Sequence, residues 1–207
     1  MPNTALELIG QSIYDALAAK QKSRDEALVL SRTAIRHCAN SIRASHRGEA
    51  DAAAGLLGKA RDGVASLFAV VKDYPDLRYM GFVDDAQKEF AEASIVRALI
   101  LSKALPSPED LGVDLAPYVN GLAEAASEMR RYILDRVRQA DFTRCEELLE
   151  AMDDIYQVLV AMDFPDAMTG GLRRTTDMLR GVLERTRGDL TVALRQRDLE
   201  IKLERLA

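Results

Sequence analysis

The sequence predicts an all-α protein, and two observations carry that prediction. Apolar residues recur at spacings of three and four along most of the 207-residue chain, and no stretch alternates strictly between polar and apolar residues. That period is typical of amphipathic helices rather than strands. The six prolines and twelve glycines fall mostly at a few joints, namely KDYPDLRYMG, ALPSPEDLG, DLAPYVNG and DFPDAMTGG.

These joints divide the chain into six predicted helices. In order they cover residues 4–47, 49–73, 78–104, 116–139, 142–162 and 169–204, and a break near residue 22 is left open in the first. Ser107, Asp141 and Thr169 are predicted N-caps, because their side-chain oxygens can accept hydrogen bonds from the first turn of a helix. No internal repeat or low-complexity segment is found, so we expect a single domain over residues 1–207.

The last predicted helix carries one long apolar stripe. Its members recur at spacings of seven and four: Leu172, Leu179, Leu183, Leu190, Leu194 and Ile201. A stripe of this length is more than a compact monomer usually buries, so part of it is expected to face another subunit. The alternative is a long helix lying across its own bundle.

Composition excludes several classes of protein. The net charge of −5 does not indicate nucleic-acid binding, which would need a local basic surface. No apolar run approaches the roughly 20 residues that span a membrane, and the N-terminus does not resemble an export signal. The two cysteines, Cys38 and Cys145, form no C-x-x-C. We therefore expect a reduced, cytoplasmic protein.

Two acidic residues occupy an unusual position at the start of an apolar run. In KEFAEASIVRALIL, Glu89 and Glu92 lie three apart and in line with Phe82, Val96 and Leu99. The neighbouring face is also mostly apolar, so the helix is expected to be covered around much of its circumference. Carboxylates in such a setting must be paired, hydrogen-bonded or bound to a cation.

A second acidic pair lies in GLAEAASEMRR. Glu124 and Glu128 are four residues apart and are flanked by alanines and a serine, which would let another helix or a substrate approach closely. Four carboxylates from two helices are suitable ligands for Mg²⁺ or Mn²⁺, since these ions prefer oxygen. Such an ion can activate water and stabilise charge on a phosphoryl oxygen. The alternative is a solvated or salt-bridged face.

A basic stripe is predicted on the first helix. Arg32, Arg36, Arg43 and Arg47 fall within a narrow arc, with His46 beside them, whereas the buried side is marked by Leu28, Ile35, Cys38 and Ile42. One interpretation is a solvated face. The other is a surface that contacts the phosphates of a nucleic acid without reading bases.

Four motifs, in order, resemble those of the translin family, which includes translin and translin-associated factor X. KEFAEA is similar to the Q-E-[FY]-x-E-A of the factor X branch, and YVNGLAEAASEMRR to Y-x-x-G-[VL]…E-[LM]-x-R. ADFTR resembles G-D-[FY]-[ST]-R, and LRRTTDMLR resembles L-R-[KR]-x-x-D-x-L-[KR]. The resemblance spans most of the chain and is strongest from about residue 76 to 190.

The resemblance implies a helical bundle that assembles into a closed, roughly octameric shell around RNA or single-stranded DNA. In the factor X branch it implies a Mg²⁺-dependent endoribonuclease. Glu89 and Glu92 correspond to two catalytic acids, Glu124 falls where the family has an Asp, and Glu128 falls on an acid shared more widely. The short chain is similar to the compact microbial members, which assemble from a single chain type.

The sequence therefore favours a homo-oligomeric endoribonuclease that cleaves single-stranded RNA with a Mg²⁺ or Mn²⁺ ion held by Glu89, Glu92 and Glu124, with Glu128 in support. The first alternative is a non-catalytic shell that binds RNA or single-stranded DNA. A more distant one is an all-α nucleotide pyrophosphohydrolase, which needs a second E-x-x-D, whereas here an E-x-x-x-E follows Glu92 by 32 residues.

Overall fold

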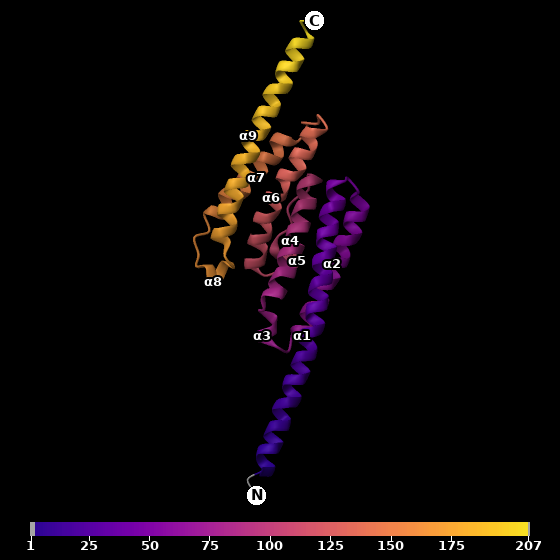
Figure 1. Ribbon diagram of the computed structural model, residues 1–207, viewed down its shortest axis with the longest axis vertical. Coiled ribbons are helices and arrows are strands. Elements are labelled where there is room, and N and C mark those ends of the chain that lie inside the picture. Colours follow the sequence, from indigo (N-terminus) through magenta and orange to yellow (C-terminus); the bar gives the residue numbers. More distant parts are fainter. Residues whose placement is uncertain (1–2, 207) are drawn as a thin grey trace.

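Helices are the regular elements of the computed structural model, which describes residues 3–206 (Figure 1). They are α1 (Asn3–His46), α2 (Ala50–Val71), α3 (Pro75–Arg78), α4 (Gly81–Ile100), α5 (Pro108–Leu111), α6 (Leu115–Arg138), α7 (Cys145–Val160), α8 (Asp166–Thr169) and α9 (Leu172–Glu204). The prediction of an all-α protein is confirmed. In that described range, no helix combines the length and apolar character needed to cross a membrane.

The bundle is built around α4 and α6, which run side by side in the same direction. α1 packs against α2 and α4, and α6 packs against α7 and α9 (Figure 1). α4 and α6 can be parallel because the segment from 101 to 114 crosses back along the bundle before α6 begins. Gln87 on α4 fixes the end of this crossover, since its Oε1 accepts a hydrogen bond from the backbone N–H of Asp114 at 2.8 Å.

The expectation that the acidic helix is covered on most sides is confirmed. Half of the residues of α4 are buried, and Phe90, Ile95 and Val96 are fully inaccessible. Buried positions on α6 face them, including Met129 and Ile133. The apolar residues of both helices thus form one core, and the carboxylates lie at its edge.

The predicted helices are found, but their ends differ at the joints. α1 is continuous through residue 22, and the one-turn helices α3 and α8 occupy two joints where none was predicted. Ser107 is an N-cap as predicted, because its hydroxyl and Asp110 form a capping box at α5.

Two of the three predicted N-caps are wrong. Asp141 lies before α7, where its Oδ1 accepts hydrogen bonds from the backbone and hydroxyl of Thr143, and α7 begins only after Arg144. Thr169 ends α8 instead of starting α9, which follows Gly170 and Gly171. Both glycines have positive φ angles, which suits residues without a Cβ and allows the sharp turn.

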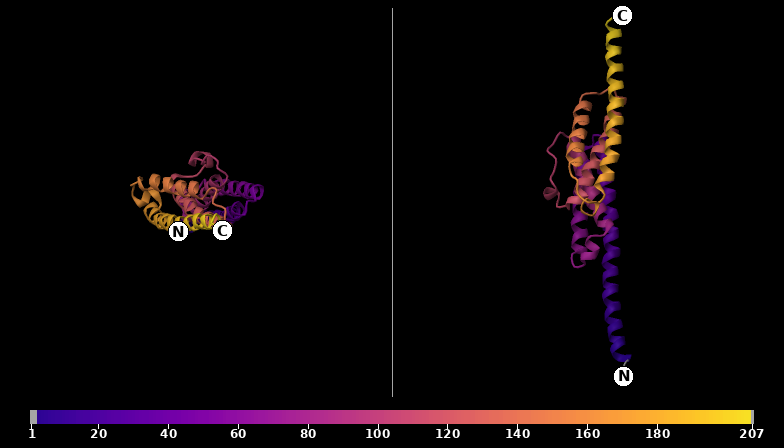
Figure 2. Two further views of the ribbon diagram at one scale, coloured as in Figure 1. Left: turned by 90° about the horizontal axis from the view of Figure 1, so that it is seen from above. Right: turned by 90° about the vertical axis from the view of Figure 1, so that its left-hand side faces the viewer.

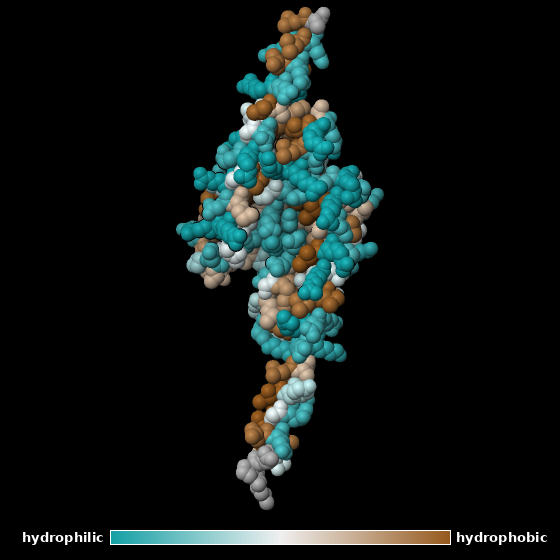
Figure 3. Space-filling model, in the orientation of Figure 1, coloured by the Kyte–Doolittle hydropathy of each residue, from teal (hydrophilic) through white to brown (hydrophobic). Residues whose placement is uncertain are grey.

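The two longest helices extend beyond the bundle at opposite ends (Figures 1 and 2). Residues 4–19 of α1 are all exposed, and their apolar side chains are visible along the lower projection in Figure 3. On α9, Leu179, Leu183 and Leu190 are buried, whereas Ile201 is 39% exposed. Most of the apolar stripe of α9 therefore packs on the bundle of its own chain, whereas the last turns of α9 extend beyond that bundle.

Candidate functional site

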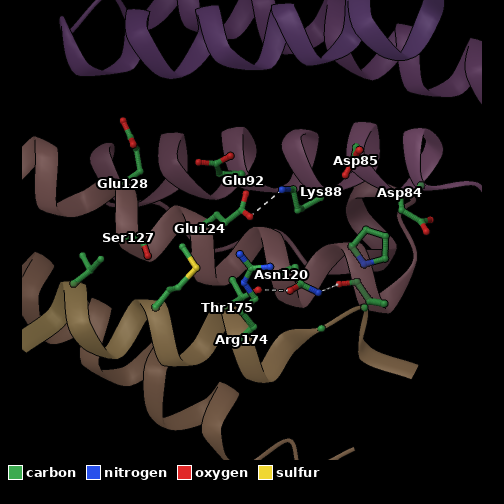
Figure 4. Close-up of a pocket in the computed structure, with 17 residues that line it drawn as sticks. Asp84, Asp85, Lys88, Glu92, Asn120, Glu124, Ser127, Glu128, Arg174 and Thr175 are labelled. Atoms are coloured by element: carbon green, nitrogen blue, oxygen red, sulfur yellow. Dashed lines mark hydrogen bonds and ion pairs between the residues drawn. The ribbon is translucent and has the colours of Figure 1, made fainter. Parts of the chain in front are cut away.

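Three of the predicted acidic residues converge between α4 and α6. Glu89 and Glu92 on α4 and Glu124 on α6 each place a carboxylate oxygen so that the three oxygens lie within 4.8 Å of one another. All three residues are partly exposed, so the oxygens remain accessible to water. The acids meet because α4 and α6 are parallel and carry them at the same level along the bundle, as Figure 4 shows for Glu92 and Glu124.

A glycine on α6 permits the close approach that brings these acids together. A Cβ at Gly121 would lie 2.7 Å from the backbone oxygen of Lys88 and 3.1 Å from the backbone nitrogen of Glu92. Glu124 follows Gly121 by one turn, so it is held directly beside α4. Ala123 and Ala125, which flank Glu124, are fully buried, in agreement with the expectation that small residues admit a neighbouring helix.

The carboxylates are crowded and poorly solvated. Burial, then the charges of Glu89, Glu124 and Glu128, raise the pKa of Glu92 to about 8. Burial also raises the pKa of Glu89, against the opposing charge of Lys88. Glu92 is therefore partly protonated near neutral pH unless a further cation binds.

A cation that was not predicted lies inside the cluster. The Nζ of Lys88 donates a hydrogen bond to Oε1 of Glu124 at 2.8 Å (Figure 4). It also lies 3.8 Å from Oε1 of Glu89. Burial lowers the pKa of Lys88, but the hydrogen bond to Glu124 and the acidic neighbours outweigh it, so the pKa is raised. One signal was present in the sequence, since Lys88 precedes Glu92 by one helical turn.

Glu128, the fourth predicted acid, lies apart from these three and against α1. The side chain of His46 is 4% exposed, and its Nε2 lies 2.8 Å from Oε1 of Glu128, although the contact is too oblique for a good hydrogen bond. The imidazole also packs on the ring of Tyr132, with the centroids 5.9 Å apart. His46 therefore contacts Glu128 from the α1 side, a position that the sequence did not predict.

Cys38 of α1 also faces the acids, and its thiol is inert. Burial, then the charges of Glu89 and Glu92, raise its pKa to about 12. A thiolate nucleophile is therefore not available at neutral pH.

The predicted arginine stripe lies on the exposed side of α1. Arg32, Arg36, Arg43 and Arg47 are all exposed. Arg47 is paired with Glu49 through two hydrogen bonds of 2.7 Å, which reduces its contribution to a basic surface. Arg43 precedes His46 by three residues, so the stripe borders the side of α1 that contacts Glu128.

A groove of about 740 Å³ runs along the acids between α4, α6 and α9. Glu92, Glu124 and Glu128 lie along one wall, and Arg174 and Thr175 of α9 along the other (Figure 4). Buried Asn120 ties the walls together, because its Oδ1 accepts a hydrogen bond from the hydroxyl of Thr175 at 2.8 Å. The participation of α9 was not predicted, since the motifs gave no information on which helix would face the acids.

Fold and site together define an all-α bundle whose two central parallel helices present an acidic cluster to an open groove. No family model matches the sequence. The crystal structure of AfC3PO is similar, with a TM-score of 0.81 and 33% identity over 94% of this chain and 99% of that one. The structure of the AfC3PO–duplex RNA complex has a TM-score of 0.77 at the same identity, over 94% of this chain and 98% of that one.

Two further relatives agree with this result. Apo-NeC3PO shares the fold, with a TM-score of 0.79 over 93% of this chain and 98% of that one, at 18% identity. An uncharacterized protein of Methanocaldococcus jannaschii is 29% identical over 196 residues, which is 94% of this chain and 86% of that protein. The chain belongs to the translin and translin-associated factor X family, as its motifs indicate.

Proposed function

We propose that the protein is a metal-dependent endoribonuclease that cleaves single-stranded RNA. The observation that carries the proposal is the convergence of Glu89, Glu92 and Glu124 within 4.8 Å of one another beside an open groove. The similarity to AfC3PO, whose structure is known as a complex with duplex RNA, supports RNA as the ligand.

The donor set fits Mg²⁺ or Mn²⁺. It consists of carboxylate oxygens only, which these hard cations prefer. Burial and then the charges of the neighbouring acids raise the pKa of Glu92, and a bound cation would offset both effects. Glu89, Glu92 and Glu124 would hold the ion, which when bound supplies charge stabilisation at a phosphoryl oxygen and a more acidic water.

The remaining residues of the site have distinct roles in this proposal. Glu128, which contacts His46 and lies 3.8 Å from Arg131, would orient water at the edge of the cluster. Arg174, on the opposite wall of the groove, is placed to contact a phosphate. Substrate would thus lie between α9 and the acids.

One observation favours a non-catalytic RNA- or single-stranded-DNA-binding protein as the second candidate. The ammonium of Lys88 already satisfies Glu124 and approaches Glu89, so part of the negative charge is neutralised without a metal ion. In that case the acids would have a structural role, and the groove and the arginines would bind the nucleic acid without cleaving it.

We also propose that the chain forms a closed homo-oligomer of about eight subunits. Leu6, Ile9, Ile13 and Leu17 recur at helical spacing along α1, and each is more than half exposed. A second copy of the chain is the proposed cover, because a symmetric assembly buries such surfaces in every subunit at once.

The central test combines mass in solution with cleavage. Light scattering at micromolar protein is expected to give more than four subunits, with and without RNA. A single-stranded RNA should be cut with Mg²⁺ present, and a chelator should stop the reaction. A monomer or simple dimer would contradict the assembly, and equal cleavage after chelation would contradict the metal centre.

The arginine stripe should contribute to RNA affinity in a salt-dependent way. Each phosphate contact adds roughly 0.7 to 0.9 to the magnitude of the log–log salt slope, so Arg36→Ala with Arg43→Ala should reduce the slope by roughly 1.5 and weaken binding at low salt. Fluorescence anisotropy with a labelled single-stranded RNA measures both.

The matched control removes two exposed charges from α2, as Lys59→Ala with Arg61→Ala. If both double variants bind like the unmodified protein, the stripe on α1 is a solvated face.

A further inference from the structure

Lys88 has no part in the proposed reaction, yet its ammonium lies inside the acidic cluster. We propose that Lys88 is a resident cation that competes with the divalent ion for Glu124 and so lowers the affinity of the site for that ion. This inference rests on the proposed metal centre.

The competition follows from the position of one oxygen atom. Oε1 of Glu124 accepts a hydrogen bond from the Nζ of Lys88 at 2.8 Å. A Mg²⁺ ion bound to the same oxygen would lie at about 2.1 Å from it, so the two cations would be within about 5 Å of each other. Repulsion between a univalent and a divalent cation at about 5 Å amounts to roughly tenfold in binding constant even at the dielectric constant of water.

Lys88 is held in place by the packing of the two helices. Its backbone oxygen lies against Gly121, and its side chain is only 25% exposed. Glu124, Glu89 and Asp85 all favour its charged form. The ammonium therefore cannot leave the cluster without losing several acidic partners. Its presence should for this reason lower the affinity of the site for the divalent ion.

The ammonium should also stabilise the metal-free cluster. It lies 2.8 Å from Oε1 of Glu124 and 3.8 Å from Oε1 of Glu89, so it offsets part of the repulsion among the acids. A Gln at position 88 keeps a polar side chain of similar length and good helix propensity but removes the charge. The metal-free Lys88→Gln protein should therefore melt at a lower temperature than the unmodified protein, and added ion should restore more of its stability.

The test is calorimetric titration of Mn²⁺ into metal-free protein without RNA. Lys88→Gln is expected to bind the ion at least about tenfold more tightly than the unmodified protein. Lys88→Arg keeps the charge and should bind close to the unmodified value. Lys59→Gln, which removes an exposed lysine from α2, should have no effect.

The possible results separate this inference from the proposed function. If the Lys88→Gln protein binds Mn²⁺ as tightly as the unmodified protein, or more weakly, the proposed competition is wrong. The proposed metal centre is not affected by that result. Absence of binding in both, with Glu92→Gln indistinguishable from them, would overturn the metal centre and the inference together. Thermal melting with and without Mn²⁺ gives an independent readout of the same equilibrium.

Discussion

Glu92→Gln is expected to lower Mg²⁺-dependent cleavage of single-stranded RNA by about a hundredfold or more, because loss of a residue that only supports a metal ligand already costs 10- to 100-fold. Glu89→Gln should behave in the same way. Both changes keep the size of the side chain and its capacity to form hydrogen bonds while removing its charge. RNA binding should persist, since the arginines of α1 and Arg174 on the opposite wall of the groove are unchanged.

The same variant should change stability in a direction that depends on pH. The pKa of Glu92 is about 8 in the folded protein against an ordinary value of 4.5, so the folded state holds a proton that the unfolded state releases. For an acid shifted in this direction, unfolding becomes easier as pH rises from about 4.5 to about 8. In a chelator, Glu92→Gln should therefore raise the melting temperature at pH 9 and change it little near pH 4.5.

An exposed acid on α7 provides the control for Glu92→Gln. Glu150→Gln alters an exposed acid on α7 and should affect neither cleavage nor the pH dependence of melting. If the acids instead form structural ion pairs, Glu92→Gln should lower the melting temperature and leave activity alone. Full activity in Glu89→Gln would end the nuclease proposal and favour the binding protein.

Gly121→Ala is expected to destabilise the protein by about 2 to 3 kcal/mol, the upper part of the usual range for overpacking. The added methyl would meet backbone atoms of α4 at 2.7 and 3.1 Å, and a backbone cannot move aside as a flexible side chain can. In a chain of this size, the expected fall in melting temperature is roughly 5 to 10 °C.

The variant should also separate the acids. Moving α6 away from α4 shifts Glu124 relative to Glu89 and Glu92, so Mn²⁺ affinity should fall together with stability. The control is Gly55→Ala on α2, where no atom lies within 4 Å of the added methyl and the higher helix propensity of alanine should stabilise slightly. A Gly121→Ala protein as stable as the unmodified one would show that the close approach of the helices is not required.

Periodicity was sufficient to predict the helices and the candidate acids, because both depend on spacing within one helix. The apolar stripe around Glu89 and Glu92 indicated a covered helix, and burial of α4 confirms it. The ends of helices were predicted less well, since Asp141 satisfies its own loop and Thr169 precedes two glycines in the left-handed region. Local turn geometry, rather than residue type, determined those boundaries.

The environment of the acids depended on contacts that no spacing reveals. Lys88 occupies the position of the Gln in the family motif, and Glu124 occupies the position of an Asp. Nothing in the sequence links these two replacements to each other. Their contact at 2.8 Å requires the register of α4 on α6, which the packing at Gly121 sets. The approach of His46 to Glu128 likewise depends on how α1 crosses the bundle.

The exposed start of α1 has a consequence for how the protein comes into being. Residues 4–19 are all exposed and project from the bundle (Figure 1), so the tertiary packing that stabilises most helices is reduced there within one chain. They are also the first part of the described chain to leave the ribosome, well before α4 and α6 exist. In the proposed assembly a second copy of the chain would cover this segment, so its helicity at high dilution should report whether the subunits have associated.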